Sequence, residues 1–142
     1  DEFRAASDVL HVVTDDGSYA RRGNVCLPLD EMLSAGEKFD RVIAIGPLVM
    51  MKFATAKARE YGIPVTVSMN PIMIDGTGMC GGCRLTLIED GKRVVRFACV
   101  DGPDFDGYAV DFDEAMERGG MYREAERHAY ARDCDLFGKA EG

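Results

Sequence analysis

Three short apolar segments recur in the first half of the chain, at residues 9–13, 42–45 and 65–67. Their hydrophobic residues run on continuously instead of alternating with polar ones, which is typical of strands buried on both faces of a parallel sheet. We therefore expect three parallel strands with both faces covered.

Two helical patterns lie between these segments. The first begins near Pro28 and ends at Gly36, and the second covers residues 48–61 and ends at Gly62, since glycine is common just after a helix. The order strand–helix–strand–helix–strand predicts an α/β fold with right-handed crossovers. The inward-facing candidates of the second helix are Val49, Met50, Phe53, Ala54 and Ala56.

The second half of the chain has a different composition. Glycine, cysteine and turn residues dominate residues 70–103, and apolar runs at 84–88 and 93–97 flank the dipeptide Asp90-Gly91. Such a dipeptide between two apolar runs predicts a β-hairpin with a two-residue turn. Beyond it, residues 112–116 and 121–134 have the pattern of exposed, charged helices interrupted by Gly119-Gly120.

The predicted hairpin has a consequence for the cysteines. Its turn sets the cross-strand partners, so that Glu89 faces Lys92, Leu87 faces Val94 and Arg84 faces Phe97. Continued beyond Arg84, this register places Cys83 opposite Ala98 and Gly82 opposite Cys99. We therefore expect Cys80, Cys83 and Cys99 to converge at the open end of the hairpin.

Composition and charge narrow the class of protein. The chain has 142 residues, of which 46% are hydrophobic and 30% are charged, as in globular proteins. Its formal net charge of −8 argues against nucleic acid as a partner. No apolar run approaches the roughly 20 residues that span a bilayer, and the first residues do not resemble a signal peptide. We expect a cytoplasmic protein with no membrane partner.

The cysteines indicate metal or redox chemistry. There are five, an odd number, and two of them form Cys80-Gly81-Gly82-Cys83. Without a secretory signal, such a pair is more typical of a metal or redox site than of a disulfide framework. A four-cysteine zinc ribbon needs a second Cys-x-x-Cys pair, and the position that would complete it is Gly102.

A [2Fe–2S] cluster also takes four ligands, commonly spaced Cys-x4-Cys-x2-Cys with a distant fourth. Counted back from Cys80, the first position of this pattern is Asp75, whose carboxylate can still bind iron, and the remaining ligands are Cys83 and Cys99. The backbone could curl around an inorganic group at Gly76, Gly78, Gly81 and Gly82. Two alternatives are a zinc or mononuclear iron site, and a glycine-rich turn with incidental buried cysteines.

Other residues that can carry chemistry have simpler explanations. We expect Cys26 to be a small buried hydrophobe, Cys134 to lie in a polar tail without a role, His11 to be a core or sheet-edge residue, and His128 to lie on a surface helix. Asp101, Asp104 and Asp106 resemble a calcium-binding run, but the Gly102-Pro103 dipeptide within it is typical of a turn.

Two segments of the chain resemble a known family. Residues 68–83 (SMNPIMIDGTGMCGGC) and 97–103 (FACVDGP) are similar to the small electron-transfer subunit of NADH-dependent ferredoxin:NADP⁺ oxidoreductase, also called the sulfide dehydrogenase alpha subunit. The related electron-transfer subunits of dihydroorotate dehydrogenase carry cysteine at the position of Asp75, so the aspartate favours the first group. The resemblance covers nearly the whole chain.

The resemblance implies a ferredoxin-reductase-like fold, in which an FAD-binding barrel precedes a nucleotide-binding lobe and a [2Fe–2S] appendage. The chain corresponds to the C-terminal part of the lobe at residues 1–69, a cluster-binding segment with a β-hairpin at 70–110, and a helical tail at 111–142. By this resemblance, we expect the barrel and the first strands with their Gly-rich turn to lie outside the present sequence. FAD therefore belongs to the intact subunit, and we expect this chain alone to lack flavin-dependent turnover.

The resemblance also locates a nucleotide site, formed by Thr14, Asp15, Asp16, Gly17 and Ser18 after the first strand and by Gly46, Pro47 and Met50 after the second. Ligands bind at such carboxyl ends of strands in open α/β sheets. Carboxylates at 15 and 16 can accept hydrogen bonds from ribose and repel a 2′-phosphate, which favours NAD(H) over NADP(H), while Arg21 and Arg22 act in the opposite direction. A plain Asp-Gly turn is the structural alternative for the first loop.

The function that the resemblance implies is electron transfer between NAD(P)H, FAD and a [2Fe–2S] cluster. The electrons pass to a larger glutamate-synthase-like flavoprotein subunit, and ferredoxin is reached through the complex. Three alternatives are the electron-transfer subunit of a dihydroorotate dehydrogenase, a non-redox interaction module that binds zinc, and a nucleotide-binding regulatory domain with a vestigial cluster loop.

Overall fold

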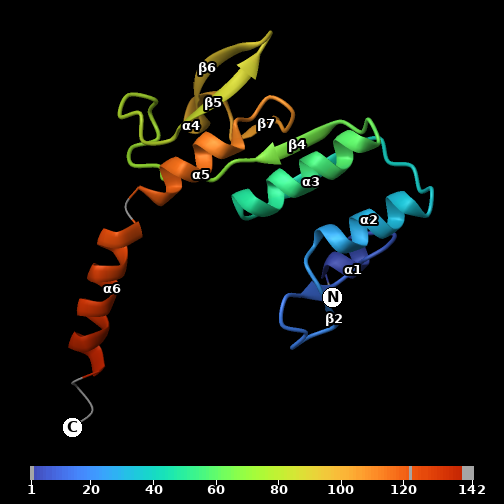
Figure 1. The fold of residues 1–142 in the computed structure, drawn as a ribbon, viewed down its shortest axis with the longest axis horizontal. Helices are drawn as coiled ribbons and strands as arrows, with labels where there is room; N and C mark the ends of the chain where they lie inside the picture. Colours follow the sequence, from blue (N-terminus) through green and yellow to red (C-terminus); the bar gives the residue numbers. More distant parts are fainter. Residues whose placement is uncertain (1, 122, 139–142) are drawn as a thin grey trace. The chain divides into compact units, whose positions relative to one another are not determined.

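The computed structural model describes residues 2–121 and 123–138, with side chains described as far as residue 130. The chain forms two compact units (Figure 1). The first consists of Asp1–Met69 together with Asp104–Tyr108, and the second of Asn70–Pro103 together with Ala109–Gly142. The chain therefore leaves the first unit after residue 69 and returns to it for only five residues.

The first unit is built on a three-stranded sheet in the order β3–β4–β7. Strand β3 (Val42–Ile45) runs parallel to β4 (Val65–Ser68), and α3 (Leu48–Glu60) connects them. Strand β7 (Asp104–Asp106) pairs antiparallel with β4. Strand β7 was not predicted from the sequence, and it begins directly after the Gly102-Pro103 dipeptide. Its Phe105 is buried between two exposed aspartates, the alternation of a strand with one covered face.

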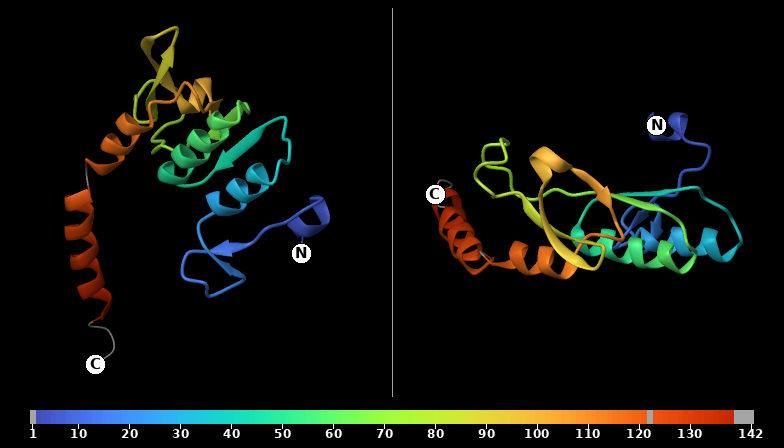
Figure 2. Two further views of the ribbon diagram at one scale, coloured as in Figure 1. Left: turned by 45° about the vertical axis from the view of Figure 1, so that its right-hand side comes forward. Right: turned by 90° about the horizontal axis from the view of Figure 1, so that it is seen from above.

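Helix α3 packs on this sheet through a face other than the predicted one. Its buried residues are Met51, Ala54, Thr55 and Ala58, which follow the i, i+3, i+4, i+7 spacing of one helix face. The small side chains on this face let the helix lie close to the sheet (Figure 2). Val49 and Phe53 are 53% and 61% exposed. Ala56 is also exposed and Met50 is half-buried, so of the predicted inward residues only Ala54 is buried.

The prediction of a strand over residues 9–13 was wrong. Strand β1 contains only Val13–Thr14, and it pairs in parallel with β2 (Arg21–Arg22) in a separate two-stranded sheet. Val9 is 67% exposed, and Ile43 and Ile45 of β3 are 65% and 70% exposed. Continuous apolar runs do not distinguish strands covered on both faces from strands covered on one, and β3 is covered on one. The unit also contains α1 (Glu2–Ala6) and α2 (Cys26–Ser34).

The second unit contains the hairpin of β5 (Arg84–Glu89) and β6 (Lys92–Phe97). Its register pairs Arg84 with Phe97, Leu87 with Val94 and Glu89 with Lys92, the pairing expected from a turn at Asp90-Gly91. Both turn residues have positive φ, 51° and 74°, as the favoured two-residue hairpin turns require. The ladder ends at Phe97, however, where helix α4 (Ala98–Asp101) begins, so Gly82 and Cys99 do not pair as strand residues.

Helix α5 (Phe112–Gly120) covers one face of the hairpin, and α6 (Arg123–Gly138) follows it. The Asp111 carboxylate caps α5 by accepting a hydrogen bond from the Glu114 N–H at 3.0 Å, and the Asp111 N–H donates to the Thr86 carbonyl at 3.0 Å. The core of this unit contains Leu85, Leu87, Val110 and Phe112, which are all buried. Within the described part of the chain, no helix is both long and apolar enough to cross a membrane.

Candidate functional site

The hairpin brings two of the predicted ligands together. Cys83 directly precedes β5 and Cys99 lies in α4 directly after β6, so pairing of the strands places the two residues side by side. The Ala98 N–H donates to the Cys83 carbonyl at 3.1 Å, and the Cys83 Sγ–H donates to Cys99 Sγ at 3.2 Å. Cys83 is buried and Cys99 is half-buried.

The other two predicted ligands, Asp75 and Cys80, lie in the exposed loop before β5. One Asp75 carboxylate oxygen accepts the Thr77 N–H at 2.9 Å. The pKa of Asp75 is lowered by this hydrogen bond and, to a smaller extent, by hydrogen bonding with Cys80. The Cys80 Sγ accepts the Gly82 N–H at 3.4 Å. The four predicted ligands therefore occur as two pairs, Asp75 with Cys80 and Cys83 with Cys99.

The expected convergence of three cysteines is thus only partly observed. Cys83 and Cys99 meet, but among the described residues no three Cys, His, Asp or Glu side chains are grouped closely enough to hold one metal ion. The physical reason is the turn at Gly81, whose φ is 68°. This turn separates Cys80 from the strand that carries Cys83. A single zinc ion needs four donors around one point, and two separate pairs do not provide them.

The loop backbone approaches α4 closely at Gly78. Its φ is +81°, and a Cβ atom there would lie 2.7 Å from the Val100 Cγ2 atom. Such a distance is a steric clash, so a side chain at position 78 would displace either the loop or α4. Glycine is therefore required at this position by both its backbone conformation and the available space.

The pKa values of the cysteine pair are shifted in opposite directions. Hydrogen bonding with the Cys99 backbone lowers the pKa of the Cys83 thiol. The hydrogen bond shared with Cys83 raises the pKa of Cys99. Both shifts have their origin in the contact between Cys83 and Cys99.

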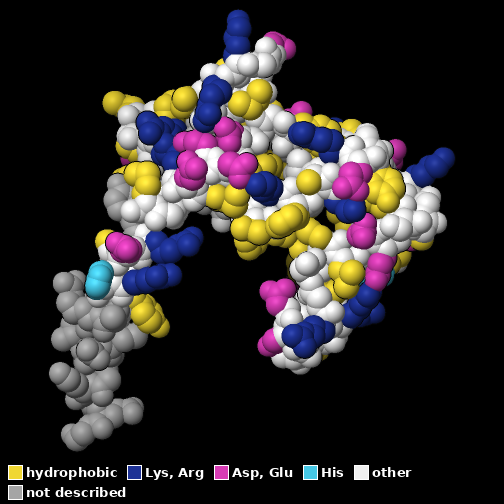
Figure 3. All heavy atoms as spheres, in the orientation of Figure 1, with side chains coloured by type: hydrophobic (Ala, Val, Ile, Leu, Met, Phe, Trp, Pro, Cys, Tyr) yellow, Lys and Arg dark blue, Asp and Glu magenta, His cyan; other side chains and the backbone are white. Residues whose placement is uncertain are grey.

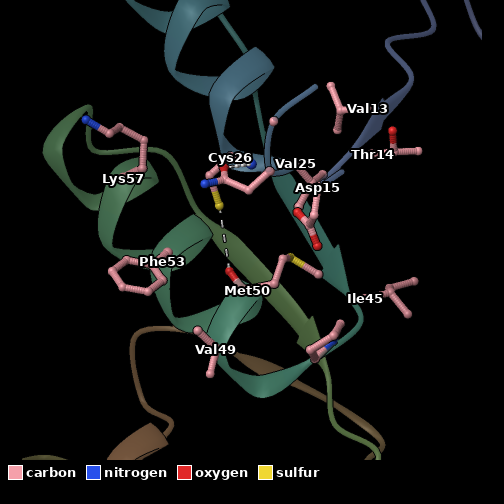
Figure 4. A pocket seen from close by; sticks show the side chains of 13 residues that line it. Val13, Thr14, Asp15, Val25, Cys26, Ile45, Val49, Met50, Phe53 and Lys57 are labelled. Carbon is pink, nitrogen blue, oxygen red and sulfur yellow. Dashed lines mark hydrogen bonds between the residues drawn. The ribbon is translucent and has the colours of Figure 1, made fainter. Parts of the chain in front are cut away.

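A cavity of about 960 Å³ lies in the first unit, where β1, α2, β3 and α3 meet (Figure 4). Of the predicted nucleotide-binding residues, Thr14, Asp15, Pro47 and Met50 line it. Gly46 lies beside it, because a Cβ atom there would be 2.6 Å from Met50 Cε. The predicted residues of two different loops are therefore brought to one cavity.

Asp16, Gly17 and Ser18 do not line this cavity. An Asp16 carboxylate oxygen accepts the Ser18 N–H at 2.9 Å, and this hydrogen bond lowers the pKa of Asp16. The Gly17 N–H donates to the Thr14 carbonyl at 3.3 Å. These residues close a turn on themselves, as the structural alternative for this loop expected.

The cavity has lining residues that the sequence pattern did not indicate, notably Asn24, Val25, Cys26, Phe53 and Lys57. Cys26 is half-buried, its Sγ lies 4.0 Å from the Met50 carbonyl oxygen, and desolvation raises the pKa of its thiol. The Lys57 Nζ contacts Asp30 of α2 and Glu60 of α3, each at 2.9 Å. The signal available in the sequence was the Gly23-Asn24 dipeptide, a pair of residues common in turns, which lies just before Val25 and Cys26.

The structure also bears on the two arginines near the first loop. Both terminal nitrogens of Arg21 contact the carboxylate of Glu31 at 2.5 Å. Paired in this way, Arg21 is not available as a phosphate ligand without breaking a two-point ion pair. Arg22 is exposed on the same strand.

Comparison with known proteins extends over nearly the whole chain. Residues 70–111 match the iron–sulfur cluster binding domain of dihydroorotate dehydrogenase B. The chain is 51% identical over 141 residues to a Thermotoga maritima homolog of the electron transfer subunit of dihydroorotate dehydrogenase B (NAD(+)), covering 99% of this chain and 48% of that protein. It is 41% identical over 112 residues to a probable subunit of this kind from Methanocaldococcus jannaschii, covering 79% of this chain and 40% of that protein.

A solved structure of NADH-dependent reduced ferredoxin-NADP oxidoreductase, described in terms of flavin-based electron bifurcation, contains a similar chain. The two chains are 52% identical, and their superposition has a TM-score of 0.75 and covers 93% of this chain and 46% of the other. The present chain thus spans about half the length of the relatives it matches. It belongs with the electron-transfer subunits of dihydroorotate dehydrogenase B and NADH-dependent ferredoxin-NADP oxidoreductase, and its residues 70–111 are an iron–sulfur cluster binding domain of this family.

Proposed function

We propose that Asp75, Cys80, Cys83 and Cys99 hold a [2Fe–2S] cluster, and that the chain passes electrons between this cluster and a nicotinamide nucleotide. The observation that carries the proposal is the 3.2 Å contact between the Cys83 and Cys99 sulfur atoms, together with the position of Asp75 and Cys80 in one loop directly before β5. A cluster with two irons takes two protein ligands on each iron, so two separate pairs match it. The donor set is three soft thiolates and one carboxylate, all suited to iron.

The surroundings of the pairs support the same assignment. The thiols of Cys80, Cys83 and Cys99 are free, and the Gly82 N–H already donates to the Cys80 sulfur. Backbone N–H donors to sulfur stabilise the negative charge of an iron–sulfur centre. When bound, the cluster supplies one-electron transfer, which connects two-electron hydride chemistry to a one-electron carrier.

The cavity of the first unit is the proposed site for NAD(H) or NADP(H). Its walls are mostly apolar, with Val49 and Phe53 as large exposed side chains able to contact a planar ring, and the Asp15 carboxylate can accept hydrogen bonds from ribose hydroxyls. Because Arg21 is paired with Glu31, the balance of charge near the first loop favours NAD(H). The residues that line the cavity belong to a region, 1–69, that we propose is part of a nucleotide-binding lobe.

The parts of the function that need other segments or chains are proposed from the relatives. FAD would be bound by the portion of the relatives that this chain does not span, followed by electron transfer to a larger glutamate-synthase-like flavoprotein subunit and, through it, to ferredoxin. The match of residues 70–111 to dihydroorotate dehydrogenase B supports a second candidate. A partner subunit that reduces orotate would identify the chain as the electron-transfer subunit of a dihydroorotate dehydrogenase.

The test is the iron, zinc and acid-labile sulfide content of the full chain prepared anaerobically, together with its absorption spectrum. We expect about two irons and two sulfides per chain, with visible absorption that bleaches on reduction. Asp75→Ala should lower the iron content and change the spectrum, whereas Cys26→Ser, which removes a thiol of the first unit, should leave both unchanged. Stoichiometric zinc in a colourless protein would overturn the proposal and support a structural metal module.

A further inference from the structure

The thiols of Cys83 and Cys99 lie close together at the open end of the hairpin. Arg84 and Phe97 are paired in the hairpin ladder, and the Ala98 N–H donates to the Cys83 carbonyl at 3.1 Å. Since Cys83 precedes this ladder and Cys99 follows it, the two sulfur atoms lie 3.2 Å apart. A disulfide has an S–S distance of about 2.0 Å, so the sulfurs need to approach by roughly 1.2 Å.

The two thiols differ in their access to solvent. Cys83 is 2% exposed, whereas Cys99 is half-buried. A dissolved oxidant therefore reaches Cys99 first, and Cys83 lies within reach of any adduct formed there. This is the arrangement of an attacking thiol and a resolving thiol.

Cys80 lies outside this pair. It is exposed, and its sulfur accepts a hydrogen bond from Gly82 in the loop that also carries Asp75. Among the cysteines whose side chains the structure describes, Cys83 and Cys99 have the sulfur–sulfur contact. An oxidant can modify Cys80 singly, but the backbone favours one intramolecular bond.

We propose that Cys83 and Cys99 form a reversible disulfide in the chain that carries no cluster, and that this bond blocks cluster loading until it is reduced. With a small-molecule disulfide such as oxidised glutathione, the Cys99 sulfur attacks one sulfur of the oxidant and releases one glutathione thiol. The Cys83 sulfur then attacks the Cys99 sulfur of the mixed disulfide and releases the second. Two cysteine thiols are oxidised, and one glutathione disulfide is reduced to two thiols.

The disulfide follows from the geometry of the second unit alone, and its effect on loading rests on the proposed function. Oxidation would remove both donors of one iron while leaving Asp75 and Cys80 in place. It would also protect both cysteines from irreversible oxidation, since a disulfide is recovered by a dithiol and a sulfinic acid is not. The open end of the hairpin thus has a second, redox-sensitive state.

The chemical step is tested on the full chain, freed of metal by a chelator and of reductant by buffer exchange. After incubation with oxidised glutathione, remaining thiols are alkylated and the peptides are mapped by mass spectrometry. We expect a linked peptide containing Cys83 and Cys99, with Cys80 alkylated or singly glutathionylated. Cys26→Ser should form the same link and Cys99→Ser should not, with circular dichroism confirming that each variant is folded. A link that involves Cys80, or stable glutathione on Cys99 without a link to Cys83, would overturn the proposal.

The consequence is tested by supplying iron and sulfide to the reduced and the oxidised chain. We expect the reduced chain to take up both and the oxidised chain to take up at least tenfold less until dithiothreitol is added. If the linked chain loads as well as the reduced one, the disulfide is not a switch, and the proposed cluster is unaffected. If the reduced chain takes up no cluster while the link still forms, the proposed function fails and the blocking role fails with it.

Discussion

Cys26 combines an uncommon set of properties for a residue expected to be a plain core hydrophobe. It begins α2, lines the large cavity of the first unit and contacts the Met50 carbonyl. Burial raises the pKa of its thiol, because the desolvated thiolate is less stable. Cys80, in contrast, is exposed. The reactivity of each thiol therefore reflects the surroundings in a different unit of the chain.

This difference predicts selective alkylation. In the metal-free, reduced chain at pH 8, iodoacetamide should modify Cys80 faster than Cys26, because a raised pKa leaves less thiolate. Raising the pH toward the pKa of Cys26 should narrow the gap. Saturating NADH should slow modification of Cys26 and leave Cys80 unchanged, as followed by peptide mass spectrometry. Equal protection of both thiols, or of neither, would argue against nucleotide in this cavity.

The apolar residues of helix α3 have two tasks: some pack against the sheet, and others line the cavity. Met51 is fully buried against the sheet, while Phe53 is mostly exposed and lines the cavity. Hydrophobic side chains gather at the surface along this helix (Figure 3). The sequence pattern assigned Phe53 but not Met51 to the buried face, and residues two apart on a helix do not share a face.

Substitution to alanine should separate the two tasks. Met51→Ala removes a fully buried side chain and should lower the free energy of unfolding by about 2–5 kcal/mol, measured by denaturant titration. Phe53→Ala should change it by less than about 0.5 kcal/mol, as for a surface position, yet weaken NADH binding. Similar losses of stability in the two variants would contradict this division of α3.

The loop before β5 contains a matched pair of glycines. Gly76 and Gly78 both have positive φ, +74° and +81°, but only the second faces another side chain, with Val100 Cγ2 at 2.7 Å from a built Cβ. Backbone strain is therefore common to both positions, and steric conflict is specific to Gly78.

Iron loading should distinguish them. Gly76→Ala adds only backbone strain and should leave most of the iron bound, whereas Gly78→Ala also displaces the loop from α4 and should reduce iron content several-fold. Iron per chain after anaerobic reconstitution measures the effect, and the thermal midpoint shows whether the hairpin is intact. Equal iron content in the two variants would mean that the approach of the loop to α4 is not needed.

The whole molecule separates its two candidate chemistries between two compact units. All residues that line the proposed nucleotide cavity lie between Val13 and Lys57, and all four predicted cluster ligands lie in the segment 70–103 of the second unit. The chain crosses between the units three times, after residues 69, 103 and 108. Each site is therefore built from residues of its own unit.

Loss of the cluster should consequently leave nucleotide binding intact. Cys80→Ser removes an exposed thiol and should abolish normal iron content without changing the dissociation constant for NADH by more than about twofold, a difference of roughly 0.4 kcal/mol. Fluorescence titration of NADH against the native and variant chains measures this. A parallel loss of both properties would show that the two sites depend on each other.

Several features follow from local sequence. The Asp90-Gly91 dipeptide sets the hairpin register because a two-residue turn fixes which residues face each other, and the register then brings Cys83 to Cys99. Helix α3 begins and ends near its predicted limits because Pro47 and Gly62 interrupt the helical pattern on either side. The spacing of Asp75 and the cysteines indicated iron–sulfur chemistry without any structure, and the comparisons agree on an iron–sulfur cluster binding domain.

Tertiary structure decided what depends on distant partners. Residues 104–106 became a strand because β4, nearly 40 positions earlier, offers a free edge. Residues 9–12 did not become a strand because the partner of β1, strand β2, pairs only with Val13 and Thr14. Met51 rather than Phe53 faces the sheet because the small side chains beside it allow close packing. Turns, register and ligand spacing were thus readable from neighbouring residues, whereas strand partners, the buried helix face and the cavity at Cys26 arose only when separate segments packed together.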